Sequence, residues 1–396
     1  MVDKLSLAAS FATVAVVYLL ISRRKRRSKR HPVPLAFSSC EAATLDGYKL
    51  YISLPLGYKT ADATKHYPVL VVLDAEPYLF PLLTVCARTN HFFARTYYYP
   101  DAILVGLVAD LEADETTCFE RGSLNVKSFW DEMRPTRARD YMPTAAESPW
   151  GTWPGAVSLL SVSGHADEFA SWLATSLVPY IDGRFRTLGS AARALCGKSF
   201  GGSGVACCMI HHSCAPLFSE YLLCSPSLTW DDSAFFRIEA ERRQAHEGEA
   251  SSNEASRNEA SRDDDLDADL DAELDDVLGP PAAAGGGKTE LAVDDVGAGA
   301  SSHPPSQPNK AAAPPHAAPP HAAAVYCCVG SEEATEAAHR LKEALDSRTG
   351  EPKGEVTVEV RQGETHGSVS YPFVHRAMEV LKERWQRLEA PVWQRL

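Results

Sequence analysis

One serine of this sequence, Ser199, has a glycine two positions before it and another two positions after it, in a pattern that suits nucleophilic chemistry. The segment GKSFG (197–201) closes an apolar run at 193–199 and opens a helical pattern. A serine at so sharp a strand-to-helix turn needs strained backbone angles, and glycines two positions before and after it leave room for them. Such a turn would lift the hydroxyl of Ser199 above a sheet and aim the amide of Phe200 at a developing oxyanion. Ser199 is therefore the candidate nucleophile, and a glycine-rich joint that serves only packing is the alternative.

A histidine and three carboxylates further along the chain are candidates to activate this serine. A hydroxyl is a weak nucleophile until a base takes its proton, and a carboxylate fixes the tautomer of that base. Hydrolases with a serine on such a turn carry serine, acid and histidine in that order. His366 follows the strand-like run at 356–363, where the base is required. The acid candidates are, in order of preference, Glu333, Glu332 and Asp231.

Short apolar runs alternate with helical patterns and could position these residues. The strand-like runs are residues 48–55, 67–74, 102–109, 193–199, 221–227, 325–330 and 356–363. The helical patterns are residues 166–181, 201–212, 333–347 and 371–385. This alternation predicts an α/β fold with a mostly parallel sheet that is covered on both faces. Ligands bind outside the carboxyl ends of such strands, which is where Ser199 and His366 fall.

The N-terminus carries an uncharged segment followed by a basic one. Residues 5–22 contain no charged side chain over eighteen positions, and residues 23–30 hold seven basic ones. Eighteen residues make about 27 Å of helix, near the minimum that spans a bilayer. The basic run after the apolar segment predicts a single-pass membrane helix within residues 1–31, with the domain that follows on the cytoplasmic side. A cleaved signal or an organelle-targeting segment is the alternative.

A second segment of unusual composition, residues 245–323, interrupts the α/β material. It contains sixteen Asp and Glu against four Lys and Arg, and it ends in Pro- and Ala-rich sequence. So few aromatic and β-branched residues cannot offset the entropy cost of ordering, so we expect a disordered insertion that could bind a protein partner. Its alternating aspartates lack the glycine and the final glutamate of a calcium loop. The insertion separates residues 32–244 from residues 324–396 of one hydrolase domain.

Charge and cysteine usage exclude other classes of protein. The net charge is -13, and the only strongly basic stretch is the short run at 23–30, so nucleic-acid binding is not expected. The ten cysteines include no CxxC spacing, and most lie in apolar runs, where cysteine is usually a small buried hydrophobe. Neither a metal nor an organic cofactor is predicted.

Several sequence blocks, taken in order, resemble the α/β-hydrolase esterases related to siderophore (enterochelin-type) esterases, the esterase-D-like group. The blocks are YPVLVVLDAEPYLF (67–80), RARDYMPT (137–144), GHADEFASWLATSLVPYIDGRFRT (164–187), GKSFGGSG (197–204), SPSLTWDD (225–232), VGSEE (329–333) and GETHGS (363–368). The resemblance implies an α/β-hydrolase fold with Ser199 as nucleophile and His366 as base. It also implies an oxyanion hole made by the amide of Phe200 and by the turn that contains Ala75 and Glu76.

Two features of this chain bear on substrate preference. Lys198 occupies a position where the family more often has histidine. Arg137 and Arg139, on an expected loop, could receive a carboxylate, phosphate or catecholate of a substrate through forked donors. Alternatively, they could tie that loop down by pairing with Asp140 and its neighbours, and the sequence leaves both interpretations open.

These observations together predict a membrane-anchored serine esterase with its domain in the cytosol. It would hydrolyse a carboxylic ester, of siderophore type or with a small acyl group, through an acyl-enzyme. A catalytically silent membrane-anchored scaffold and an acyltransferase on the same fold are the alternatives.

Overall fold

The structure is a computed structural model, and it describes ten stretches of the chain. They are residues 40–55, 57–75, 79–88, 101–109, 126–145, 162–245, 248, 323–331, 335–347 and 354–393. The predicted membrane helix and nearly all of the predicted insertion lie outside these residues. Within them, no helix has both the length and the apolar character that a bilayer crossing requires.

Eight strands form one sheet in the order β1-β2-β4-β3-β5-β6-β7-β8. The strands are β1 (Cys40–Leu45), β2 (Tyr48–Ser53), β3 (Val69–Leu73), β4 (Ile103–Ala109), β5 (Arg193–Lys198), β6 (Glu220–Cys224), β7 (Ala324–Gly330) and β8 (Val356–Arg361). Strand β2 pairs antiparallel with β1 and β4, and every other pairing is parallel. The prediction of a mostly parallel sheet is confirmed.

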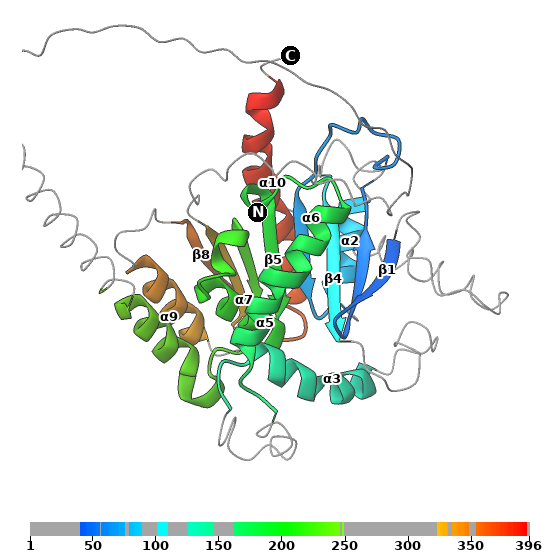
Figure 1. Cartoon of the computed structure of the whole chain (residues 1–396). Helices are drawn as coiled ribbons and strands as arrows, with labels where there is room; N and C mark the ends of the chain where they lie inside the picture. The colour runs from blue at the N-terminus through cyan, green and yellow to red at the C-terminus, as the bar shows by residue number, and fades with distance from the viewer. Residues whose placement is uncertain are drawn as a thin grey trace, which may run out of the picture. The chain divides into compact units, whose positions relative to one another are not determined.

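Helices cover both faces of this sheet (Figure 1). They are α2 (Leu79–Arg88), α3 (Val126–Tyr141), α5 (Ala166–Trp172), α6 (Val178–Arg184), α7 (Phe200–Ile210), α9 (Thr335–Asp346) and α10 (Ser370–Trp393), with residues 230–245 also helical. A π-helical turn, Leu173–Leu177, joins α5 to α6, so the pattern predicted at 166–181 is one continuous helical path. Helices α2 and α10 pack on one face, and α3, α5, α6, α7 and α9 pack on the other.

The central strands are apolar on both faces because both faces are covered. In β3, the side chain of Val71 belongs to the core beneath α5 and α7, whereas that of Val72 belongs to the core beneath α2 and α10. Both are fully buried. The unbroken apolar runs in the sequence are therefore the direct signature of a two-sided core.

The chain divides into two compact units, one made of Met1–Glu241 with Ala318–Leu396 and the other of Arg242–Ala317. The first unit contains the sheet. Its parallel strands all point the same way, so the loops after β3, β5, β7 and β8 leave from one edge of the sheet. This edge carries Ser199, which directly follows β5, and the loop after β8, which contains His366.

Candidate active site

Ser199 occupies a strained turn between β5 and α7. Its φ of 56° and ψ of -120° lie far from helical or strand values, in the left-handed region that L-residues rarely adopt. The turn is held on both sides, since the amide of Ser199 donates to the carbonyl oxygen of Cys224 at 3.0 Å and its own carbonyl accepts from the amide of Ser203 at 3.0 Å. The predicted strain at the candidate nucleophile is therefore present.

The glycines on either side of Ser199 are sterically required. A Cβ atom at Gly197 would lie 2.3 Å from the carbonyl oxygen of Gly201, and one at Gly201 would lie 2.7 Å from Oδ2 of Asp74. Both distances are shorter than real Cβ contacts, so a larger residue would displace the backbone of the turn at Gly197 and the carboxylate of Asp74 at Gly201. The predicted reason, room for the turn, holds for Gly197, whereas Gly201 leaves room for Asp74.

His366 lies exposed in the loop between β8 and α10, and this loop is tied to the serine turn. Nζ of Lys198 donates to Oγ of Ser370 at 2.5 Å and lies 3.4 Å from the carbonyl oxygen of Gly367. The residue directly before the candidate nucleophile thus contacts the residue directly after the candidate base.

The preferred acid candidates, Glu333 and Glu332, lie outside the described residues, but the residue before them is described. The amide of Ser331 donates to the carbonyl oxygen of Arg361 at 2.9 Å, and its Oγ accepts from the amide of Gly363 at 2.9 Å. These bonds hold the start of the glutamate loop against the loop that carries the candidate base.

Asp231, the third acid candidate, is engaged elsewhere. Its Oδ2 accepts from Oγ1 of Thr144 at 2.7 Å and lies 3.5 Å from a guanidinium nitrogen of Arg237. Its backbone adopts a left-handed φ of 48° at the start of the helix that follows β6. These contacts give Asp231 a local role where the chain leaves β6.

One of the predicted oxyanion donors is wrong. The amide of Ala75 donates to the carbonyl oxygen of Leu107 at 3.0 Å, which extends the pairing of β3 with β4 by one bond. An amide committed to the sheet is not turned toward a substrate. Phe200 is the first residue of α7, as the prediction requires, and Glu76 lies outside the described residues.

Arg137 forms a buried ion pair beside the serine turn. Its Nε and Nη2 donate to the same Oδ2 of Asp74, at 2.9 and 2.7 Å, and its guanidinium carbon lies 5.1 Å from the ring centre of Phe200. Asp74 is 4% exposed and Arg137 is 9% exposed. The side chain of Arg137 therefore contacts both Asp74, directly after β3, and Phe200, the first residue of α7.

Arg139 is paired with its own neighbour. Its Nε and Nη2 donate to the two carboxylate oxygens of Asp140 at 2.6 and 3.1 Å, and Oδ2 of Asp140 also accepts from the hydroxyl of Tyr48 at 2.9 Å. Burial raises the pKa of Asp140 and of Tyr48 above their usual values. Both arginines lie in α3, so the expected loop is wrong, and their contacts favour the internal-pairing interpretation over substrate binding.

Two neighbours of the site were not predicted from the sequence, namely Asp74 as the ion-pair partner of Arg137 and Ser227 as a neighbour of Ser199. Oγ of Ser227 lies 3.5 Å from Oγ of Ser199, and its amide donates to the carbonyl oxygen of Ser199 at 3.2 Å. Their positions could have indicated both residues, because each follows the carboxyl end of a parallel strand. Asp74 directly follows β3, and Ser227 comes three residues after β6.

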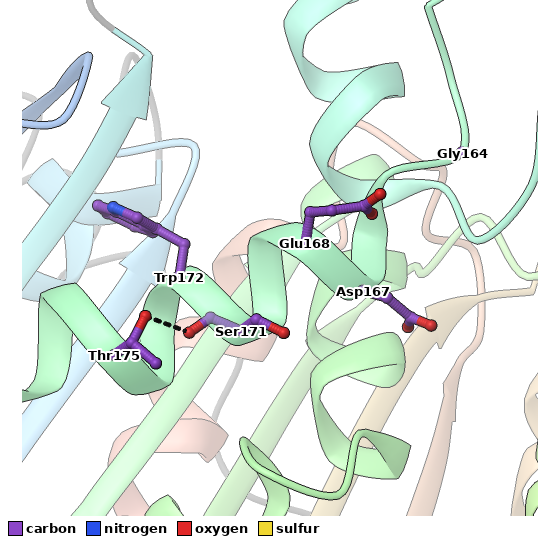
Figure 2. A pocket seen from close by; sticks show the side chains of 6 residues that line it. All are labelled: Gly164, Asp167, Glu168, Ser171, Trp172 and Thr175. Atoms are coloured by element: carbon purple, nitrogen blue, oxygen red, sulfur yellow. Dashed lines mark hydrogen bonds between the residues drawn. The ribbon is translucent and has the colours of Figure 1, made fainter.

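A pocket of about 570 Å³ lies on the α5 side of the protein, and its lining contains none of the predicted catalytic residues. Figure 2 shows its lining, which consists of Gly164, Asp167, Glu168, Ser171, Trp172 and Thr175. Its walls come from α5, the π-helical turn and the residues before them.

Metal-ligand clusters and disulfides are absent from the described part of the chain. No group of three or more His, Cys, Asp or Glu side chains there could hold a metal ion. The nine cysteines described there are free thiols, and seven of them are buried.

Solved structures with a similar fold include three proteins, and two of them are hydrolases. The BES protein from Bacillus cereus shares 16% identity at a TM-score of 0.53, over 90% of this chain and 99% of that chain. The siderophore hydrolase EstA from Aspergillus nidulans shares 16% identity at a TM-score of 0.51, over 90% of this chain and 98% of that chain. An IroE-like serine hydrolase from Shewanella oneidensis shares 17% identity at a TM-score of 0.50, over 87% and 80% of the two chains. No curated protein matches the sequence.

A family model gives the more specific result. The model described as "Putative esterase" matches residues 140–376, which contain the serine turn, the glutamate loop and the histidine loop. The match covers more than half of the chain, and it agrees with the strained serine at the strand-to-helix turn. The chain belongs to this Putative esterase family and is a carboxylic ester hydrolase.

Proposed function

We propose that this esterase works through an acyl-enzyme formed on Ser199, with His366 as its base. The observation that carries the proposal is the left-handed backbone of Ser199 at the turn between β5 and α7. The bond from Lys198 to the loop of the histidine adds support, because it joins the neighbours of the two reacting residues.

The proposed reaction has two balanced halves. In the first, Oγ of Ser199 attacks the ester carbonyl carbon while His366 takes the hydroxyl proton. The oxyanion accepts from the amide of Phe200 and from that of Glu76, and its collapse expels the alcohol, which receives the proton from His366. In the second half, water attacks the acyl-enzyme while His366 takes one of its protons, and collapse returns that proton to Ser199 and releases the carboxylic acid.

The proposed substrate is a carboxylic ester of siderophore type or one with a small acyl group. The sequence resemblance supports this class, and a siderophore hydrolase shares the fold. A panel of p-nitrophenyl esters and polyester siderophores, assayed by titration of the released acid, tests it. Hydrolysis of none of them would favour the silent scaffold, and turnover only with an added alcohol would favour the acyltransferase.

The acid of the proposed triad is Glu333. The loop that contains it begins at Ser331, which is bonded to Gly363 near the candidate base. Replacing Glu333 by glutamine should lower kcat by roughly 10³- to 10⁴-fold, because an unfixed histidine tautomer loses most of its basic function. Steady-state kinetics of Glu333→Gln, Glu332→Gln and Asp231→Asn measure this. A larger loss in either of the other two variants would move the assignment to that residue.

The insertion is proposed to be dispensable for the chemistry. It returns to the sheet at Ala324, which pairs with Glu220, the first residue of β6, so it rejoins the sheet at the edge opposite Ser199. Deleting residues 249–322 and joining the flanks with a short linker should therefore leave kcat on a small ester nearly unchanged. Loss of activity in a folded deletion variant would mean that the segment acts as a lid. Its acidic tract stays a candidate surface for a protein partner.

Membrane attachment is the proposed role of residues 1–31. The support is the uncharged segment at 5–22 followed by the basic run at 23–30. Deleting residues 1–31 should release an active esterase from the membrane fraction, and neutral replacements in the basic run should weaken or invert the orientation. Protease treatment of sealed vesicles measures the orientation. Protection of the domain until detergent is added would contradict its cytoplasmic placement.

A further inference from the structure

Lys198 bridges the serine turn and the histidine loop. It is the last residue of β5 and is half-buried. Its Nζ donates to Oγ of Ser370 at 2.5 Å and lies 3.4 Å from the carbonyl oxygen of Gly367. Oγ of Ser370 donates to the same carbonyl oxygen at 3.3 Å. The three groups form a closed triangle of polar contacts, in which Lys198 lies 169 residues from Gly367 in sequence.

The loop that Lys198 contacts is braced internally. The amide of Thr365 donates to Oγ of Ser368 at 3.0 Å, and the amide of Ser368 donates to Oγ1 of Thr365 at 3.3 Å. Ser370, the first residue of α10, is only 3% exposed, so the packing of that helix fixes its position. The bonded residues Thr365 and Ser368 lie on either side of His366 in sequence. Restraining Gly367 and Ser370 therefore also restrains the backbone of His366.

An ammonium group suits this task. It carries three donors and no acceptor, so it can serve a hydroxyl and a carbonyl at once. Hydrogen bonds from a charged donor are about twice as strong as neutral ones. The reacting atoms of an ester hydrolase must also be held closely, since a misplacement of about 1 Å can cost 10²-fold in rate.

We propose that Lys198 is a positioning residue that sets the loop of His366 at the distance from Ser199 that proton transfer requires. This inference rests on the proposed function, because it gives Lys198 a task only if Ser199 and His366 react. Lys198 itself contacts neither the ester nor the attacking water. Since the base moves a proton in both halves of the reaction, loss of the bridge lowers kcat and leaves substrate binding nearly intact.

The first test compares two substitutions of this lysine. Lys198→Met keeps most of the side-chain length but removes all donors, and it should lower kcat by about 10- to 100-fold with KM nearly unchanged. Lys198→Arg retains the charge and the donors and should recover most of the loss. Lys65→Met is the matched control, because Lys65 forms an exposed ion pair with Asp101 at 3.6 Å just before β3, at the opposite edge of the sheet. It should keep the kcat of the parent enzyme.

A double-mutant cycle isolates the bridge itself. Ser370→Ala removes one acceptor of the ammonium, so alone it should lower kcat less than Lys198→Met does. Combined with Lys198→Met it should add almost nothing, because both changes remove the same contact. If Lys198→Met folds poorly, Ser370→Ala alone tests the bridge, because it removes an acceptor of the ammonium and should lower kcat with KM nearly unchanged. An unchanged kcat in that variant would then overturn the proposal. Fully additive losses would overturn the proposal.

The outcomes also separate this inference from the proposed function. Unchanged kcat in Lys198→Met, together with loss of activity in Ser199→Ala and His366→Ala, would refute the bridge and leave the acyl-enzyme proposal intact. Equal changes in kcat and KM, accompanied by a lower melting temperature, would show a general structural role and would likewise overturn it. Full activity of Ser199→Ala would instead refute the proposed function.

Discussion

Replacing Ser199 by alanine is expected to lower kcat by about 10⁴-fold or more, since no other group then forms the acyl-enzyme. The strained turn around Ser199 is set by its backbone and by the two glycines, so the fold should survive the substitution. Alanine differs from serine only in lacking Oγ, so the substitution adds no atom that could disturb the contacts of this turn. Steady-state hydrolysis of a p-nitrophenyl ester, with circular dichroism as the check on folding, measures the effect.

Ser227 provides the comparison for this prediction. Its hydroxyl lies 3.5 Å from that of Ser199, so it is the neighbouring hydroxyl that would act if the assignment were wrong. The loss of kcat in Ser227→Ala should be at least about 100-fold smaller than the loss in Ser199→Ala, because Ser227→Ala removes only one weak hydrogen bond. A reversed ranking of the two variants would assign the chemistry to Ser227.

Replacing Arg137 by methionine is expected to destabilise the protein by about 3–5 kcal/mol, because it leaves a buried carboxylate without its counter-ion. Asp74 receives both donors of Arg137 on Oδ2, and its Oδ1 is buried with no hydrogen-bond partner among the described residues. The carboxylate has little contact with water that could replace the guanidinium, since Asp74 is 4% exposed. Urea denaturation measures the loss of unfolding free energy.

Two further variants test the cause of this loss. Arg184→Met removes an exposed arginine whose ion pair with Glu41 spans 3.4 Å, and it should cost less than about 1 kcal/mol. Adding Asp74→Asn to Arg137→Met should recover part of the stability, because the unpaired charge disappears. If Arg137→Met loses no more unfolding free energy than Arg184→Met does, then burial does not make the Arg137–Asp74 ion pair more important for stability than an exposed one.

The parts of this protein that could be predicted from sequence are those that obey local rules. The serine turn is one, because crowding within five residues, between Gly197 and the carbonyl oxygen of Gly201, requires the first of its glycines. The buried strands are another, since two-sided burial leaves unbroken apolar runs such as that of β3. Strand β1 escaped prediction, although the Asp46-Gly47 pair before β2, with φ values of 48° and 82°, carries the sequence signal of a tight hairpin.

The parts that could not be predicted depend on distant pairings. Arg137 finds Asp74 across 63 residues, and nothing in either segment alone indicates the partner. The amide of Ala75 is unavailable to an oxyanion only because β4 lies beside β3 and offers the carbonyl of Leu107. Arg137 and Arg139 were expected on a loop, yet α3 continues through Pro135 to Tyr141 because its buried side packs against α7. Tertiary contacts decided each of these features.

The most direct test of the central claim is the site at which a fluorophosphonate becomes attached. Such a reagent phosphonylates an activated serine and loses its fluoride, so the product marks the nucleophile without knowledge of the natural ester. The protein should gain one phosphonyl group, and mass spectrometry of its peptides should place that group on Ser199, with no labelling of Ser199→Ala. A modified residue other than Ser199, or an active esterase that takes up no label, would contradict the acyl-enzyme on Ser199.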